Sequence, residues 1–211
     1  MNEKHIVVQQ PAQPEQLILL FHGVGDSAAG MAPVGSHFAQ AFPQAQVISI
    51  NGPFASSMGG GRQWFSVQGI TEQGRQGRID EVIPEFIATV RYWQQQSGLG
   101  ARQTTLVGFS QGTIMSLEGV KAQPQLAGQV IGFSGRFATL PQQAIVGVAI
   151  HLIHGEQDGV IPVEQANAAA QCLTALGAAV TLDLDANTGH GINQPMLARA
   201  IAHLRQDLAG N

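Results

Sequence analysis

The stretch Leu106-Val107-Gly108-Phe109-Ser110-Gln111-Gly112 decides how this chain folds. The apolar run from Thr104 to Phe109 predicts a short buried strand, and the segment from Gln111 to Lys121 predicts a helix that begins directly after Ser110. A tight turn from strand to helix holds a serine hydroxyl up at the edge of a sheet, and glycines on both sides let the neighbouring elements pack closely. The pattern therefore predicts a strained turn that presents Ser110 as a nucleophile.

The five letters Gly-x-Ser-x-Gly also fit an ordinary glycine turn, because the chain has 26 glycines. The strand before Ser110 and the helix after it are the context that a nucleophile requires, and they favour that interpretation. A second stretch, Gly132-Phe133-Ser134-Gly135, also follows an apolar run. It lacks the second glycine spacing, and no helical pattern follows it directly, so we do not expect a nucleophile there.

Composition limits the classes of function. A chain of 211 residues is long enough for one α/β domain, and we expect residues 1–211 to form a single domain. The net charge is −4 and only 11% of the residues are charged, which gives no electrostatic footprint for nucleic acid or acidic membranes. One cysteine, Cys172, excludes an intramolecular disulfide. No secretion-type apolar core follows the first residues and no 18-residue apolar run occurs, so we expect a cytoplasmic protein.

Short apolar runs alternate with amphipathic segments along the chain, which predicts an α/β fold with a mostly parallel central sheet. The expected strands are His5 to Gln9 (an edge strand), Leu17 to Phe21, Val47 to Ile50, Thr104 to Phe109, Gln129 to Phe133, Val148 to Ile153 and Ala179 to Leu184. The expected helices are Ala28 to Phe42, Arg78 to Gln96, Gln111 to Lys121, Val163 to Leu176 and Gln194 to Leu208.

The segment from Asn51 to Gly77 is long, rich in glycine and without a clear period. It contains Trp64, Phe65 and other large apolar residues, which disordered segments rarely carry. We therefore expect an ordered loop folded over a surface or a pocket. Trp64 and Phe65 either line a pocket for an acyl group or form a small core of the loop itself, and the sequence leaves both alternatives open.

A serine hydroxyl needs a base to take its proton. Where the nucleophile lies on a turn of this kind, the chain order is serine, then a carboxylate, then histidine. His190 lies in a loop just after the last expected strand, and the carboxyl ends of strands are where catalytic groups gather. His203 is also late enough in the chain, but it falls within the last expected helix. The order therefore favours His190 as the base.

The base needs a carboxylate to orient it, and Asp158 is the first choice. It follows the strand that ends at Ile153, in a turn closed by Gly159 and Pro162. Glu156 is nearer to that strand, and Asp183 and Asp185 at the end of the next strand are the fallback.

Two backbone N–H groups are needed to stabilise a developing oxyanion. The N–H of Gln111, directly after Ser110, is one candidate. The other is expected from the loop after Phe21, where the N–H of Val24 is our choice. His22 in the same loop is interpreted as a packing residue that shapes the loop. Neither a metal nor a cofactor is expected.

These motifs together resemble the phospholipase/carboxylesterase family of α/β-hydrolases, which includes acyl-protein thioesterases and small bacterial carboxylesterases. The resemblance spans about Leu17 to Leu208 and is greatest to the small carboxylesterase of enteric bacteria. The motifs that carry it are Phe21-His22-Gly23-Val24-Gly25-Asp26, Arg62-Gln63-Trp64-Phe65, Gly108-Phe109-Ser110-Gln111-Gly112, His154-Gly155-x-x-Asp158-x-x-Ile161-Pro162 and Gly189-His190.

The resemblance implies a catalytic triad of Ser110, Asp158 and His190, oxyanion donors at Val24 and Gln111, and a fold with little or no cap domain. It implies a serine carboxylesterase for short- to medium-chain acyl esters, with Trp64, Phe65 and Ile161 near the substrate. Thioesterase or lysophospholipase activity on longer chains, or a non-catalytic binding module on the same scaffold, are the alternatives. The family commonly has an aspartate two residues after the loop tryptophan, where this chain has Ser66.

Overall fold

A seven-stranded sheet in the order β1-β3-β2-β6-β7-β8-β9 forms the centre of the computed structural model, which describes residues 5–209. All neighbouring strands are parallel except β1, which pairs with β3 in the antiparallel sense at one edge. The strands are β1 (His5–Gln9), β2 (Gln16–Phe21), β3 (Ala45–Ile50), β6 (Thr104–Phe109), β7 (Gln129–Phe133), β8 (Ala149–Gly155) and β9 (Ala179–Asp185). The mostly parallel α/β sheet and its edge strand are confirmed.

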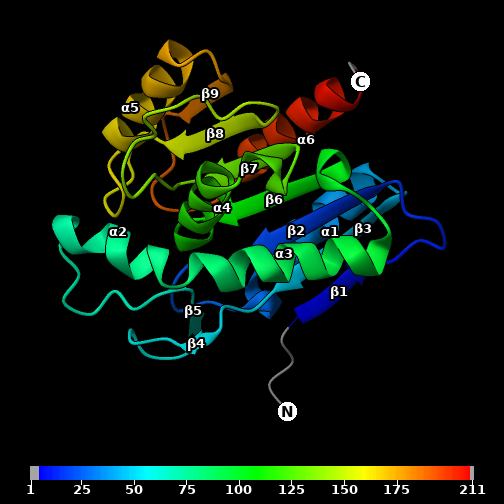
Figure 1. Ribbon diagram of the computed structural model, residues 1–211, viewed down its shortest axis with the longest axis horizontal. Helices are drawn as coiled ribbons and strands as arrows, with labels where there is room; N and C mark the ends of the chain where they lie inside the picture. The colour runs from blue at the N-terminus through cyan, green and yellow to red at the C-terminus, as the bar shows by residue number, and fades with distance from the viewer. Residues whose placement is uncertain (1–4, 210–211) are drawn as a thin grey trace.

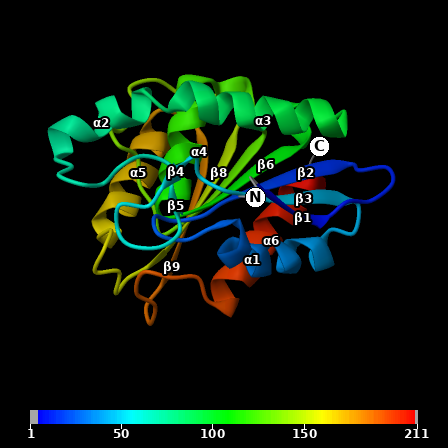
Figure 2. The ribbon, with the colours of Figure 1, turned by 90° about the horizontal axis from the view of Figure 1, so that it is seen from below.

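Helices cover both faces of this sheet, as Figures 1 and 2 show. The helices are α1 (Ala28–Ala41), α2 (Glu72–Asp80), α3 (Ile83–Ser97), α4 (Gln111–Ala122), α5 (Val163–Ala175) and α6 (Gln194–Ala209). Short 3₁₀ turns, η1 (Ala101–Gln103) and η2 (Pro124–Leu126), lie before β6 and β7. In Figure 2, α3, α4 and α5 lie above the sheet, and α1 and α6 lie below it.

Two apolar clusters hold these layers together, because the central strands are buried on both faces. On one face, Leu106 of β6 and Leu19 of β2 pack in a cluster with Phe86 of α3 and Leu117 of α4. On the other face, neighbouring strand residues pack with Phe38 of α1 and with residues of α6. Because both faces of these strands are covered, their residues are apolar at consecutive positions in the sequence.

The parallel strands carry their following loops to one edge of the sheet. Phe21 at the end of β2 pairs with Gly108 near the end of β6, so the loop after β2 begins beside Ser110. The ends of β7, β8 and β9 follow in register along the same edge. In Figure 1 this is the edge toward which the arrowheads of the parallel strands point, and α2 lies beyond it.

The segment from Asn51 to Gly77 differs from the expectation of a loop without regular elements. It contains the short antiparallel pair β4 (Phe54–Ala55) and β5 (Arg62–Gln63), and α2 begins within it at Glu72. Thr71 caps α2 by accepting a hydrogen bond from the Gly74 N–H, a local signal that offsets the glycines of this helix.

The predicted start of the helix from Arg78 to Gln96 is wrong. The chain turns at Glu81 and Val82 after α2, and α3 begins anew at Ile83. The physical reason is Pro84, which has no N–H to donate and is therefore best placed in a first turn. Within residues 5–209, no helix is both long and apolar enough to cross a membrane.

Candidate active site

Ser110 lies on a sharp turn between β6 and α4, with φ of 51° and ψ of −112°. Its N–H donates to the Phe133 carbonyl of β7 at 3.0 Å. The turn is possible because Gly112 has no side chain: a Cβ there would lie 1.9 Å from the Phe21 carbonyl oxygen. A non-glycine residue at positive φ stores strain that the surrounding packing must hold, which is typical of a functional turn.

Ser110, His190 and Asp158 meet at the carboxyl edge of the sheet. The Ser110 Oγ is 2.9 Å from His190 Nε2, and His190 Nδ1 is 2.8 Å from Asp158 Oδ2. Because an ionised carboxylate only accepts hydrogen bonds, Nδ1 carries the proton and Nε2 is free to accept the serine proton. The structure thus brings together the three residues that the sequence predicted, in the geometry that serine activation requires.

The Asp158 carboxyl is buried in the turn after β8. Burial alone would raise the pKa of Asp158, but hydrogen bonds from His190 and from the N–H groups of Ile161 and Val160 together hold that pKa below its ordinary value. Both backbone bonds reach Oδ1 at 2.9 Å, so Oδ2 faces His190. The turn therefore keeps the carboxylate charged and aimed at the imidazole.

The loop after β2 lies against the Ser110 turn. A Cβ on Gly23 would lie 3.3 Å from the Ser110 Cβ, so glycine allows this close approach. Among residues 5–209, neither the Val24 N–H nor the Gln111 N–H donates a hydrogen bond to a backbone carbonyl. The Gln111 N–H also belongs to the first turn of α4, where N–H groups have no partner within the helix.

Long-range hydrogen bonds hold this loop in place. His22 is fully buried, its Nε2 accepts the Gly52 N–H at 2.9 Å, and its Nδ1–H therefore donates to the Gly23 carbonyl at 2.6 Å. Burial lowers the pKa of His22, which favours this neutral form. The expectation that His22 shapes the loop agrees with these contacts. Arg62 of β5 pairs with the loop through its backbone, donating to Asp26 and accepting from Gly25.

The Gln111 side chain links the turn to the segment that carries Trp64 and Phe65. Its Oε1 accepts the Trp64 N–H at 2.7 Å, and its Nε2 donates to the Phe65 carbonyl at 2.8 Å. The Trp64 indole N–H donates to the His22 carbonyl at 2.9 Å. Trp64 is therefore bonded to both of the segments whose N–H groups flank Ser110.

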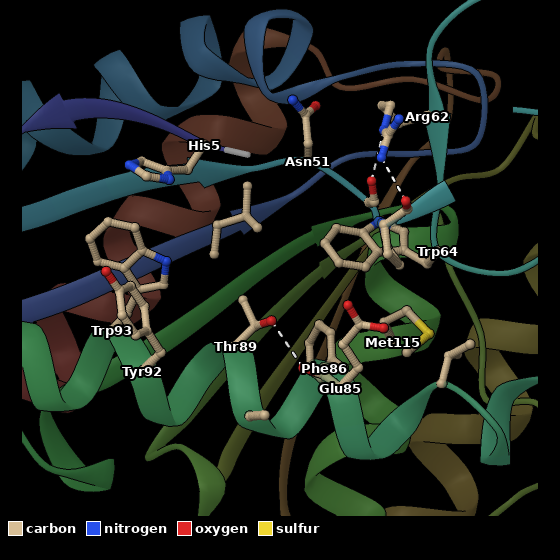
Figure 3. A pocket seen from close by; sticks show the side chains of 15 residues that line it. His5, Asn51, Arg62, Trp64, Glu85, Phe86, Thr89, Tyr92, Trp93 and Met115 are labelled. Carbon is tan, nitrogen blue, oxygen red and sulfur yellow. Dashed lines mark hydrogen bonds between the residues drawn. The ribbon is translucent and has the colours of Figure 1, made fainter. Parts of the chain in front are cut away.

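Trp64 also lines a cavity of about 750 Å³ between α3 and the ends of β1 and β3. Figure 3 shows Trp64, Phe86 and Trp93 along this hollow, with Arg62 bonded to two backbone carbonyls at its edge. None of the three residues Ser110, Asp158 and His190 lines it. The Trp64 ring is 3% exposed and packs edge-on against Phe21 and Phe86, so it belongs to the core as well as to the cavity wall.

Phe65 and Ile161 lie beside the site but do not line this cavity. Both are buried, Phe65 at 2% exposed and Ile161 at 8%. Their backbones bond to Gln111 and to Asp158, respectively. At Ser66, where the family commonly has an aspartate, the segment is anchored instead by Arg78, whose Nη1 donates to the Ser66 and Gln68 carbonyls.

The alternative residues are bonded elsewhere. His203 of α6 bonds to Asp183 of β9 at 2.6 Å, and Asp185 accepts from Thr188 at 2.7 Å. Glu156 is exposed. Ser134, in the second glycine-flanked stretch, also has a positive φ, 46°, but it is fully buried and donates to the Gly191 carbonyl.

Sequence reasoning gave no role to the guanidinium of Arg62, the Gln111 side chain or His154, whose ring lies in the Asp158 turn. The Gln111 bonds span 46 and 47 residues, whereas those of Arg62 and His154 span 7 to 10 residues within irregular segments. No periodic pattern in the sequence predicts bonds of either kind. The residues 5–209 contain no cluster of three or more histidine, cysteine or acidic side chains arranged to hold a metal ion.

Comparison with known proteins gives a family match and several relatives. The model of the family described as Phospholipase/Carboxylesterase matches residues 2–208. The esterase YpfH of Escherichia coli (strain K12) is 52% identical over 206 residues, which cover 97% of this chain and 89% of the relative. Acyl-protein thioesterase 1 of Kluyveromyces lactis is 26% identical, over 74% of this chain and 76% of its own.

Solved structures agree with this match. The crystal structure of esterase PE8 superposes with a TM-score of 0.85 at 29% identity, covering 92% of this chain and 93% of that one. The Bacillus cereus carboxylesterase gives a TM-score of 0.82 at 15% identity, over 96% of this chain and 93% of that one, and so supports the fold alone.

Proposed function

The chain belongs to the phospholipase/carboxylesterase family of α/β-hydrolases and acts on carboxylic ester bonds, and we propose that it does so through an acyl-enzyme on Ser110. The observation that carries this proposal is the unbroken chain of hydrogen bonds from Ser110 Oγ through His190 to Asp158. Such a chain activates a hydroxyl that is otherwise a poor nucleophile near neutral pH.

In the first half of the proposed reaction, Ser110 Oγ attacks the carbonyl carbon of the ester while His190 Nε2 takes the hydroxyl proton. The tetrahedral intermediate collapses, the bond to the alcohol oxygen breaks, and His190 returns the proton to the departing alcohol. In the second half, His190 deprotonates a water molecule that attacks the acyl-enzyme, which releases the carboxylic acid and restores the Ser110 hydroxyl. Asp158 stabilises the imidazolium formed in each half.

We propose that the N–H groups of Val24 and Gln111 stabilise the oxyanion. The close approach of Gly23 to Ser110 places the Val24 segment beside the nucleophile. The first turn of α4 also directs its partial positive charge toward the same place. Donors fixed in this way need no rearrangement as the negative charge develops.

We propose short- to medium-chain acyl esters as substrates, with Trp64, Phe65 and Ile161 limiting the acyl site. All three are joined by backbone bonds to Gln111 or Asp158, so they lie next to the chemistry. The apolar cavity that Trp64 lines includes no triad residue, and the Trp64 indole is bonded to the loop after β2. We propose that this indole forms the wall between the acyl site and that cavity. An acyl chain of modest length then stays on the near side of this wall.

Acyl-thioester hydrolysis is the second candidate, favoured by the similarity to acyl-protein thioesterase 1 of Kluyveromyces lactis. A thioester presents the same carbonyl carbon to Ser110 and a better leaving group, so the proposed machinery serves both bonds. We further propose that residues 1–211 form one domain and act in the cytoplasm without a cofactor.

A fluorophosphonate probe and an acyl-chain series test the proposal. The probe should add one label to the wild type, at Ser110, and none to the matched Ser110→Ala variant. Initial rates with p-nitrophenyl esters and with the corresponding acyl thioesters, from two to sixteen carbons, then define the bond and the chain length. Labelling at another residue, or none in the folded protein, contradicts the proposal and favours a non-catalytic binding module.

A further inference from the structure

His154 is a buried histidine to which the proposed mechanism gives no role. It lies near the end of β8, four residues before Asp158, and is 1% exposed. Side chains alternate between the two faces of a strand, so His154 shares a face with Leu152 and turns away from the face of His151. Its ring thus enters the turn that carries Asp158.

The bonds of His154 fix the position of its proton. Its Nε2 is 2.8 Å from the Ile161 carbonyl oxygen and 3.3 Å from Asp158 Oδ2. A carbonyl and a carboxylate oxygen both accept hydrogen bonds and neither donates. The His154 Nε2 must therefore carry a hydrogen, which is donated to the Ile161 carbonyl and lies close to the Asp158 carboxylate.

Asp158 Oδ2 consequently faces two histidines. His190 Nδ1 lies 2.8 Å from this oxygen and His154 Nε2 lies 3.3 Å from it, while both backbone donors of the turn reach Oδ1. The His154 bond to Ile161 closes the same turn from within. One side chain thus acts on the carboxylate directly and through the backbone that holds it.

We propose that His154 is a positioning residue for ester hydrolysis: it orients the Asp158 carboxylate toward His190 and limits the negative charge that Oδ2 offers to the imidazole. The inference rests on the proposed roles of Ser110, His190 and Asp158. The partial positive charge of an N–H group beside a carboxylate offsets part of its negative charge. Without that donor, Oδ2 would hold the His190 imidazolium more strongly but in a less defined direction.

Two effects should follow when the Nε2–H is removed. The looser carboxylate should lower kcat by on the order of 10- to 100-fold with little change in KM, because small displacements of a catalytic group are costly. The stronger hold on the imidazolium should move the acid limb of the kcat/KM profile upward by about 0.5 pH unit. A purely structural role would lower the melting temperature without moving the limb.

The test compares His154→Asn with His154→Gln. The amide nitrogen of glutamine reaches the place of Nε2, whereas that of asparagine reaches only the place of Nδ1. We expect the loss of kcat and the shifted limb in His154→Asn and substantial recovery of both in His154→Gln. If His154→Asn fails to fold, His154→Met, which fills the site without a donor, takes its place.

His151→Asn is the matched control, because His151 is a buried histidine of the same strand that bonds to Thr181 and Asp207 instead. It should change stability and leave the acid limb in place. An unchanged limb and kcat in His154→Asn, or equal losses in His154→Asn and His154→Gln, would overturn the inference. Labelling of Ser110 by the fluorophosphonate probe in the wild type separates this failure from a failure of the proposed function.

Discussion

Gly23 and Ser110 approach so closely that a Cβ on Gly23 would lie 3.3 Å from the Ser110 Cβ. The same added carbon would lie 3.2 Å from the Phe109 ring. Contacts of this length require the neighbours to shift by a few tenths of an ångström. The loop that contains Val24 therefore packs against the turn that contains Ser110 at a distance that a side chain at position 23 would disturb.

Substitution of Gly23 by alanine should lower activity more than stability. The added methyl group pushes the Val24 segment away from Ser110, and the loss of one oxyanion donor costs about 10²- to 10³-fold in kcat. We expect a fall of at least about tenfold in kcat and a small change in melting temperature. Gly60→Ala is the control, since an added carbon there meets nothing within 4 Å. Equal kcat in the two variants would contradict the placement of the Val24 donor.

Substitution of the three triad residues should give losses that do not add. Ser110→Ala, His190→Ala and Asp158→Asn should each lower kcat by at least about 10³-fold, because the three residues act as one unit. The double variant Ser110→Ala, His190→Ala should be no slower than Ser110→Ala alone. Steady-state rates, checked against circular dichroism of each variant, provide the measurement. Near-normal turnover in His190→Ala would refute the assignment.

Much of the fold was predictable because local and global signals agree along this chain. The apolar runs of β6 and β8 and the turn at Ser110 follow from burial on both faces and from glycine spacing. The segment after β3 was not predictable in the same way. β4 and β5 have two residues each, too few for a periodic pattern, and long-range bonds such as that from Trp64 to His22 order the segment.

The residues that meet at the site were predictable from chain order, because the topology carries the loops after β6, β8 and β9 to one edge. The residues that support them were not. The Gln111 side chain bonds to a segment 46 and 47 residues away, and His154 acts within a turn whose shape the sequence does not specify. Support of this kind depends on tertiary geometry, which residue spacing does not encode.

The stability of the protein should fall as the solution is acidified below about pH 6.5, the ordinary pKa of histidine. Burial lowers the pKa of His151, against the opposing effects of its hydrogen bond to Asp207 and of the charges on Asp207 and Asp183. Repulsion by positive charge on the adjacent His203 imidazole adds to the lowering. Above the pKa that histidine has in the unfolded chain, His151 is neutral in both the folded and the unfolded protein. Its titration then does not change the free energy of unfolding. Below that pKa the unfolded chain binds a proton that the folded protein resists, so the free energy of unfolding decreases until the folded-state pKa is passed.

His151→Gln tests this sign, because glutamine keeps a donor for Asp207 and does not titrate. The free energy of unfolding, measured by urea titration at pH 7.5 and pH 5.0, should fall further in the wild type than in the variant. An identical fall in both proteins would show that His151 does not contribute to the acid sensitivity.

Trp64 should set the upper limit of acyl-chain length. Its indole lines the cavity of about 750 Å³ and is held by the bond to the His22 carbonyl. In the proposed arrangement the indole forms the wall between this cavity and the acyl site. In Trp64→Ala the cavity opens toward the acyl site, while the lost packing against Phe21 and Phe86 costs about 3–5 kcal/mol of stability. We expect lower kcat/KM for all esters, but a ratio of long-chain to acetate esters that rises roughly tenfold, since each buried methylene contributes about 0.8 kcal/mol. Trp64→Phe is the matched control: it keeps one aromatic ring at the wall and loses the second ring with its N–H, so its ratio should stay nearer to the wild-type value than that of Trp64→Ala. A ratio that falls in Trp64→Ala would mean that the indole itself binds the acyl chain. An unchanged ratio in a destabilised protein would mean that Trp64 serves only the core.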